Sequence, residues 1–107
     1  MSDAAHLASA AMPNPRKIVL HSLHGERPVL AALVADWIAE GVNYVGVVGV
    51  DAERIEDLID ALCVGDGSAP YFMLTAAHGP DESLEDAVFL AEQLSDEFAG
   101  PVSVIAF

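Results

Sequence analysis

The sequence predicts an α/β fold: a single three-layer βαβαβαβ domain around a four-stranded parallel sheet. Apolar, β-branched segments alternate with amphipathic segments along the chain, which is typical of parallel strands joined by helices. The length of 107 residues suits one hydrophobic core. The hydrophobic fraction of 53% exceeds that of disordered chains, although the formal net charge is −13.

The expected strands are runs of apolar and β-branched residues bounded by turn residues. They are residues 17–23, 43–50, 70–77 and 102–107. The second of them, NYVGVVGV, is a nearly continuous valine run, which is typical of a strand covered on both faces. Gly46 and Gly49 within this run are expected to permit close packing rather than to bind phosphate.

The expected helices carry recognisable start and stop signals and span residues 26–40, 52–64 and 83–98. Pro28 suits the first turn of the first helix, and Gly41 suits the position just after its end. Asp51 suits the N-cap of the second helix. Ser83 and Asp86 suit a capping box at the start of the third, with Asp in place of the usual Glu.

The segment before residue 16 contains no predicted strand. We expect residues 1–15 to be a flexible Ala-rich tail and residues 16–107 to form the domain. The alternatives for the tail are a short docking helix over residues 3–11 or a true start at Met12. The tail lacks the basic start and long apolar core of a secretory signal, so we expect a cytoplasmic protein.

Two strand orders fit this alternation: the flavodoxin-like order 2-1-3-4, which we favour, and the Rossmann-like order 3-2-1-4. In the favoured order, the helix at residues 26–40 lies alone on one face of the sheet. Between Val29 and Ala39 this helix has Asp36 as its only charge and is apolar nearly all round. Such a helix is expected to be buried on more than one side. The sequence therefore predicts a homodimer through helix 26–40.

The carboxyl ends of the first and third strands form the candidate ligand site. Ligands of open parallel sheets bind where the strand order reverses, which the favoured order places between these two strands. Each strand leads through a His-Gly turn to a helix N-terminus, whose free N–H groups favour anions. The candidate binding residues are His24, Gly25, Asp51, His78, Gly79 and Asp81. His24 and His78 would donate hydrogen bonds or transfer protons.

A purely structural role is the competing interpretation of these turns. In it, the two glycines supply turn geometry, Asp81 and Ser83 cap the helix, and the two histidines are half-exposed loop residues. A further variant is a transition-metal site in which both histidines act with Asp51 or Asp81. The favoured interpretation includes no cofactor. His21 is expected to be a hydrogen-bonded core histidine, since it lies within a strand.

Several known chemistries lack their motifs in this chain. The segment HSLHGERP after the first strand has one glycine, so it does not form a dinucleotide-binding loop. Neither a P-loop nor a Gly-x-Ser-x-Gly nucleophile motif is present. The layout is similar to that of phosphoacceptor receiver domains at the level of the fold alone, because it lacks their acidic pair and late lysine. Cys63 is expected to be a buried, unreactive thiol.

The charge balance restricts the partners. Asp+Glu 17 against Lys+Arg 4 argues against binding to nucleic acid and to anionic membranes. The chain has no run of about 18 apolar residues that could cross a bilayer. The carboxylates concentrate on the second and third helices, where they either keep the protein soluble or attract a basic protein partner.

We therefore expect a non-enzymatic binding or protein-interaction module. The alternative is an enzyme or sensor that binds a small molecule or anion through His24 and His78. No motif of the chain identifies a substrate or a reaction.

Overall fold

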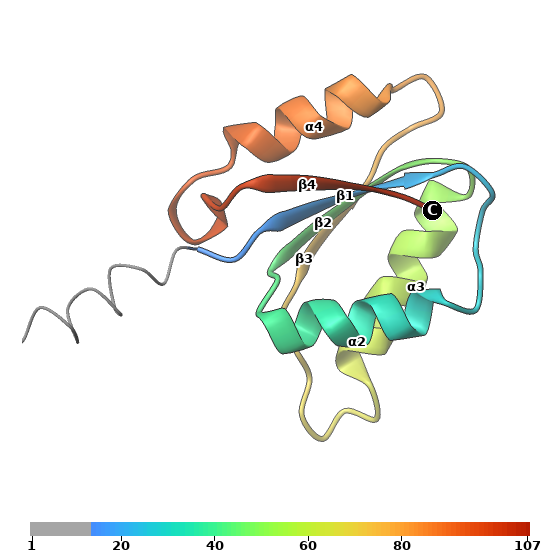
Figure 1. Cartoon of the computed structure of the whole chain (residues 1–107). Coiled ribbons are helices and arrows are strands. Elements are labelled where there is room, and N and C mark those ends of the chain that lie inside the picture. Colours follow the sequence, from blue (N-terminus) through green and yellow to red (C-terminus); the bar gives the residue numbers. More distant parts are fainter. Residues whose placement is uncertain (1–13) are drawn as a thin grey trace, which may run out of the picture.

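The computed structural model describes residues 14–107, so the predicted tail, its alternative helix and the alternative start at Met12 lie essentially outside the described residues. The elements are β1 (Lys17–Ser22), α2 (Leu30–Glu40), β2 (Tyr44–Gly49), α3 (Ala52–Val64), β3 (Leu74–Ala77), α4 (Leu84–Gln93), the 3-10 helix η1 (Asp96–Phe98) and β4 (Val102–Ala106). The strands form one four-stranded sheet in which every pair is parallel. The predicted α/β fold is confirmed (Figure 1).

The strand order is β3-β2-β1-β4, so the favoured order 2-1-3-4 is wrong and the alternative 3-2-1-4 is correct. β1, β2 and β3 follow one another in the same direction across the sheet, so the right-handed crossovers α2 and α3 share a face. The connection from β3 to β4 runs back across the sheet and therefore puts α4 on the opposite face (Figure 1). α2 packs beside α3, and α4 is the helix that lies alone.

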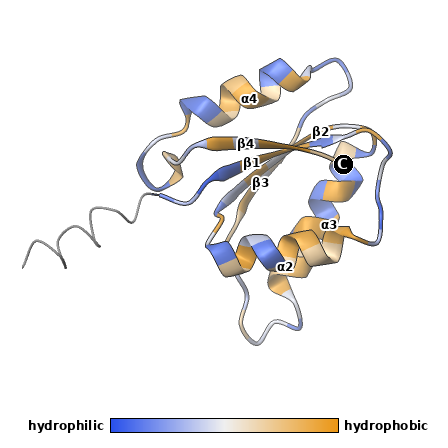
Figure 2. Cartoon of the chain, viewed as in Figure 1, coloured by the Kyte–Doolittle hydropathy of each residue, from blue (hydrophilic) through white to orange (hydrophobic). Residues whose placement is uncertain are grey.

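The two faces of the sheet have cores of different size and character. The larger core lies between the sheet and helices α2 and α3, and its main side chains are Ile18, Leu20, Leu30, Val34, Trp37, Val45, Val47, Ile55 and Ile59. The smaller core lies under α4 and contains Val19, Tyr44, Val48, Ala87 and Ala91. Small helix residues let α4 approach the sheet closely. In the part of the chain that the structure describes, a single helix covers this face, and the hydropathy colouring shows apolar segments on α4 and β4 (Figure 2).

Three predicted boundaries differ from the observed ones by four residues or more. α2 begins at Leu30 rather than at residue 26, and Pro28 lies in a turn before it. β3 begins at Leu74 rather than at residue 70, because the preceding segment is bound to other elements: Tyr71 N–H donates to Cys63 O, and the Tyr71 hydroxyl donates to Val42 O at 2.6 Å.

The predicted third helix, residues 83–98, ends early at Gln93. Leu94 has an extended backbone, and η1 follows as a separate turn. The buried ammonium group of Lys17 on β1 donates to Ala91 O near the end of α4. A cation at a helix C-terminus is favourable, so this contact stabilises the end of α4 above the sheet. At the other end, the predicted capping box of Ser83 and Asp86 is confirmed.

Gly46 and Gly49 have the packing role that the sequence predicts. The Tyr44 ring lies over Gly46, where an added Cβ would come within 2.8 Å of the Tyr44 hydroxyl oxygen. At Gly49 the backbone has a φ of 108°, and an added Cβ would collide with the carbonyl oxygen of Ser22. The close approach of β1 and β2 at their carboxyl ends therefore requires glycine.

Among residues 14–107, no helix has the length and apolarity to cross a membrane.

Replacing Gly49 with Ala tests this close approach. Gly41→Ala is the matched control, because Gly41 also has a positive φ but has open space around its Cβ position. We expect Gly41→Ala to lower the free energy of unfolding by about 1 kcal/mol. Gly49→Ala should cost at least about 2 kcal/mol, since backbone must shift as well. Urea unfolding followed by circular dichroism measures both, and equal losses would contradict the steric account.

Candidate functional site

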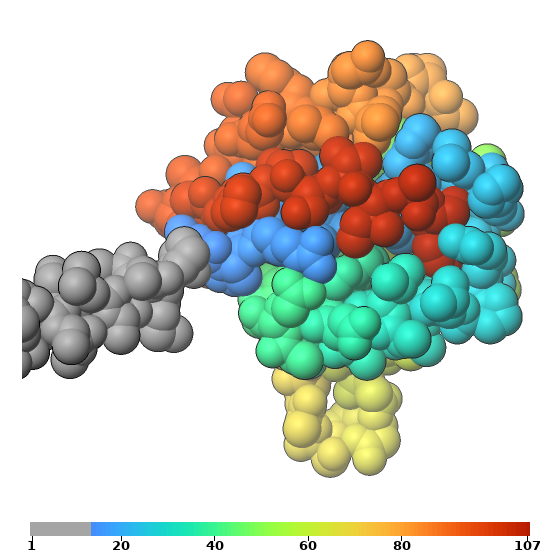
Figure 3. Space-filling view, viewed as in Figure 1, coloured from blue at the N-terminus to red at the C-terminus, as the bar shows by residue number. Residues whose placement is uncertain are grey.

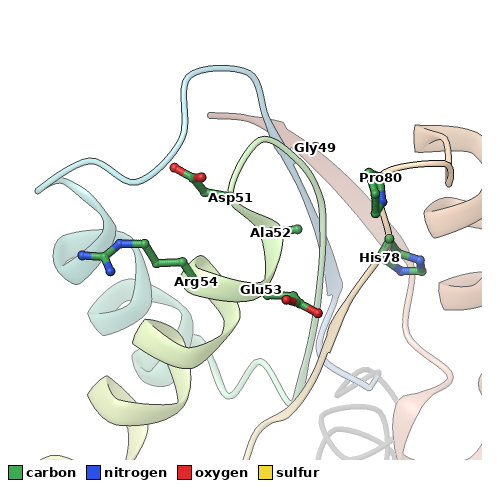
Figure 4. A pocket seen from close by; sticks show the side chains of 8 residues that line it. Gly49, Asp51, Ala52, Glu53, Arg54, His78 and Pro80 are labelled. Atoms are coloured by element: carbon green, nitrogen blue, oxygen red, sulfur yellow. The ribbon is translucent and has the colours of Figure 1, made fainter.

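A hollow of about 400 Å³ lies at the carboxyl ends of β2 and β3, whereas the sequence predicts a site at the carboxyl ends of the first and third strands. Its walls are the β2–α3 turn with the first turn of α3, and the β3–α4 turn. The lining residues are Gly49, Asp51, Ala52, Glu53, Arg54, His78, Gly79 and Pro80. In Figure 4 the side chains of Asp51 and Arg54 point away from His78 and Pro80, whereas Glu53 lies between the two walls.

The predicted residues do not form one site. β2 separates β1 from β3, so the His24-Gly25 turn and the His78-Gly79 turn are not neighbours at the rim. Asp51, His78 and Gly79 line the hollow, whereas His24, Gly25 and Asp81 do not. The strand order reverses between β1 and β4, not between β1 and β3 as the favoured order required. The predicted crevice at a switch point between β1 and β3 is therefore wrong.

His78 is buried, whereas the structural interpretation predicted a half-exposed loop residue. It follows β3 on the sheet face that carries α4, and its Nδ1 lies 3.1 Å from Glu82 Oε2. Its Nε2 is buried without a hydrogen-bond partner among the described residues. Glu82 also accepts from Gly79 N–H at 2.7 Å, and the bonds from Gly79 and His78 lower the pKa of this carboxyl. These contacts close the β3–α4 turn.

His24 and His21 are both more exposed to solvent than the sequence predicts. His24 is exposed in the β1–α2 loop. His21 lies on β1 but is only partly buried, and its side chain makes no hydrogen bond within residues 14–107. The predicted hydrogen-bonded core histidine at position 21 is therefore wrong, and the buried histidine is His78.

Asp51 occupies the N-cap position of α3 but does not cap it. Its backbone is left-handed, with a φ of 57°, and its side chain makes no capping hydrogen bond. The carboxylate instead lies against Gly25, where an added Cβ would be 2.7 Å from Asp51 Oδ2. Gly25 also has a φ of 83°, so the backbone conformation at position 25 favours glycine. The predicted turn role of Gly25 is thus the one that its geometry supports.

The electrostatics of the rim do not favour an anion. Glu53 stands at the first turn of α3, where it competes for the helix N-terminal N–H groups that would hold an anion. Asp51 adds a second carboxylate. Arg54 also lines the hollow, but its guanidinium lies 4.0 Å from Glu26, a carboxylate that does not line it. Within residues 14–107, no group of His, Cys, Asp or Glu has the geometry to hold a metal ion. The metal variant through both histidines has no support in this geometry.

A second surface lies on α4. The sequence predicts its carboxylates as a possible site for a basic partner, but not the exposed apolar residues among them. Phe89 is 63% exposed and Leu90 is 43% exposed on this helix. A hollow of about 640 Å³ runs along its flank, lined by Leu84, Glu85, Asp86, Val88, Phe89 and Glu92. We call these residues with Leu90 the α4 surface. Apolar residues between carboxylates at helical spacing are the signal in the sequence, but the favoured strand order left the first helix, not α4, alone on a face of the sheet.

The cations of the chain do not neutralise this surface. Arg16 binds Glu40 bidentately at 2.8 and 2.9 Å, and this contact raises the pKa of Arg16 and lowers that of Glu40. Arg27 stacks on the Phe107 ring with its guanidinium carbon 4.5 Å from the centroid. Lys17 is buried under α4, where desolvation lowers its pKa and the nearby Glu92 carboxylate raises it by less, so Lys17 offsets part of the charge of that one carboxylate. The fourth cation, Arg54, lies on α3 near Glu26, so none stands on the α4 surface.

Cys63 is buried on α3, as the sequence predicts. Burial raises the pKa of its thiol, which disfavours the nucleophilic thiolate. Its Sγ lies 3.9 Å from Met73 Sδ inside the larger core. Cysteine chemistry is therefore not part of either surface.

Comparison with known proteins places the chain in one family. The sequence pattern of a domain of unknown function, DUF7684, matches residues 2–104. The chain belongs to the DUF7684 family. Neither a curated protein nor a solved structure matches it. The family description assigns no activity, so the functional argument stands on the geometry of the two surfaces.

Replacing His78 or His24 with alanine distinguishes a structural role of the histidine from a binding role. We expect His78→Ala to lower the free energy of unfolding by about 1–3 kcal/mol, because it removes a buried side chain that bonds to Glu82. His24→Ala, the control at an exposed position, should change it by less than about 0.5 kcal/mol. Thermal and urea unfolding measure both variants. An unchanged stability of His78→Ala would contradict the structural role.

Proposed function

We propose that this DUF7684 protein is a non-enzymatic protein-interaction module that binds a basic, amphipathic segment of a partner on its α4 surface. The observation that carries the proposal is the hollow along α4, in which Phe89 and Val88 lie among Glu85, Asp86 and Glu92. Apolar side chains of a partner would fill the hollow, and its Lys or Arg side chains would meet the carboxylates at the rim.

The position of α4 supports this choice over other faces. Among the described residues 14–107, α4 lies alone on its side of the sheet, and no neighbouring helix of that range shields its flanks (Figure 1). An isolated exposed apolar residue needs no explanation, but contiguous apolar residues rimmed by charge are typical of interaction sites. α3 has exposed Leu62 and Val64 near its end. The hollow beside Leu62 is smaller, about 270 Å³, and Glu26 is the one carboxylate that lines it.

Charge would assist the association in its rate and its specificity. The net charge of −13 attracts a basic partner over a Debye length of about 8–10 Å at physiological salt. Carboxylates at the rim would then orient the bound segment, while Phe89 and Val88 contribute the buried apolar area.

A cytoplasmic location is part of the proposal, since a reducing compartment suits the single free thiol of Cys63.

A second candidate function is a small-ligand site at the carboxyl ends of β2 and β3. The unpartnered Nε2 of buried His78, which lines that hollow, is the observation in its favour. Because Asp51 and Glu53 flank the hollow, such a ligand would be neutral or cationic rather than anionic. The His78→Ala and His24→Ala comparison also bears on this candidate, because an unchanged stability of His78→Ala would exclude the structural role and leave binding as the role of His78.

A defined probe tests the α4 proposal: an amphipathic helical peptide of leucine and lysine, titrated into the full chain with amide shifts followed by NMR. We expect the largest shifts at residues 84–93. Glu85→Gln with Glu92→Gln should weaken binding several-fold, because each exposed pair contributes about 0.2–1 kcal/mol. Affinity should also fall as salt rises.

The matched control is the double variant Glu53→Gln with Asp57→Asn, which removes two carboxylates from α3 and leaves α4 intact. This control should bind the peptide within about twofold of the wild type, the size of a general loss of net charge. Equal weakening by both double variants, or shifts spread evenly over α3 and α4, would overturn the proposal and leave only non-specific attraction.

A further inference from the structure

The two edges of the sheet differ in their protection. β3 forms one edge and β4 forms the other. At β3, Thr75 Oγ1 lies 3.0 Å from Glu56 Oε2 and 2.8 Å from Asp60 Oδ1. These contacts hold two carboxylates of α3 beside a strand of only 4 residues. Charge next to a short edge strand is a known protection against pairing with another strand.

β4 has no such protection. Its sequence, VSVIA, contains neither a charge nor a proline, and within residues 14–107 it pairs with β1 alone. Val104 on this strand is 48% exposed. Figure 3 shows β4 uncovered between α4 on one side and α2 on the other. Uncharged, uncovered edge strands are sites of strand pairing.

The hydrogen bonds of the last residue identify which backbone groups are free. Phe107 N–H donates to His21 O, and Phe107 O accepts from Leu23 N–H, so both polar groups of Phe107 point to β1. Backbone groups of a strand alternate in direction with a period of two. The N–H and C=O groups of Val102, Val104 and Ala106 therefore point away from β1, toward the open edge.

We propose that two copies of this chain pair through their β4 edges, antiparallel across a two-fold axis at Val104. Val104 then lies opposite the second copy's Val104, and Val102 lies opposite the second copy's Ala106. Because these residues carry the outward N–H and C=O groups, each facing pair exchanges both of its backbone hydrogen bonds. The two sheets become one continuous sheet.

Charge distribution selects a second copy as the occupant of this edge. A net charge of −13 on each copy opposes self-association through α3 or α4, where the carboxylates lie. β4 is free of charge, so two copies can approach there without facing carboxylates. The protected β3 edge excludes head-to-tail pairing of β4 with β3, which would give open filaments. A closed two-fold dimer remains.

This dimer differs from the one that the sequence predicts through helix 26–40. That prediction assumed that α2 lies alone on a sheet face, whereas α2 packs beside α3. The inference also goes beyond the proposed function. A two-fold axis perpendicular to the joined sheet places both α4 helices on the same side, so two α4 surfaces flank a floor formed by the paired β4 strands.

Sedimentation equilibrium of the full chain over a range of concentrations tests the proposal. A short strand pair forms a small interface, so we expect a dimer with a dissociation constant in the micromolar range. Raising the salt concentration should strengthen the dimer, because it screens the repulsion between two acidic copies. Salt should instead weaken the peptide binding proposed for α4. Because the two effects have opposite sign and are measured separately, failure of one proposal does not decide the other.

Three variants at position 104 locate the interface. Val104→Pro removes an N–H that the monomer does not use, and Val104→Lys places two like charges opposite each other across the axis. Both should weaken the dimer about tenfold or more while the circular dichroism spectrum stays that of the wild type. Val104→Thr keeps the N–H and a β-branched side chain, so it should dimerise within about twofold of the wild type.

Several outcomes would overturn the proposal. A wild-type mass of 11.2 kDa at every concentration up to the millimolar range would exclude the dimer. A dimer that persists in folded Val104→Lys would place the interface elsewhere. Slow hydrogen exchange of Val104 N–H in a monomer would show that another segment of this chain covers the edge. If Val104→Pro does not fold, Val104→Lys, which keeps the backbone donor, decides alone.

Discussion

The parallel pairing of β1 with β2 at the centre of the sheet is the constraint on which the rest of the structure depends. Both strands are buried on both faces, from Ile18, Val19 and Leu20 on β1 to the valines of β2. With this pair in the middle, β3 and β4 become the edges, and the crossovers place α2 and α3 on one face with α4 on the other. Both proposed interaction surfaces are consequences of that arrangement.

Local residue patterns were sufficient for the elements but not for their order. Alternating apolar and amphipathic segments predicted four parallel strands, and Ser83 with Asp86 predicted the cap of α4 correctly. The valine run at residues 43–50 already indicated a strand covered on both faces, which is a central strand. The favoured order put that strand at an edge. That order also left the apolar first helix without a neighbouring helix, whereas its packing against α3 accounts for its apolar character.

The candidate site was predicted in part, because loop residues were assigned from strand order. Asp51, His78 and Gly79 do line one hollow, while His24 lies across β2 from it. Burial of His78 depends on α4 and the Glu82 carboxylate, which spacing along the chain does not reveal. The exposed apolar residues Phe89 and Val104 likewise gain meaning only once α4 and β4 have been placed on the sheet.

Cross-strand nuclear Overhauser effects in the full chain test the central arrangement most directly. The register pairs Val19 with Gly46 on one side and with Val104 on the other. Backbone contacts from Val19 to both of these residues are therefore predicted. Contacts from β1 to Ala76 of β3 in their place would mean that β1 adjoins β3, and would contradict the account of the sheet, of its edges and of the solitary α4.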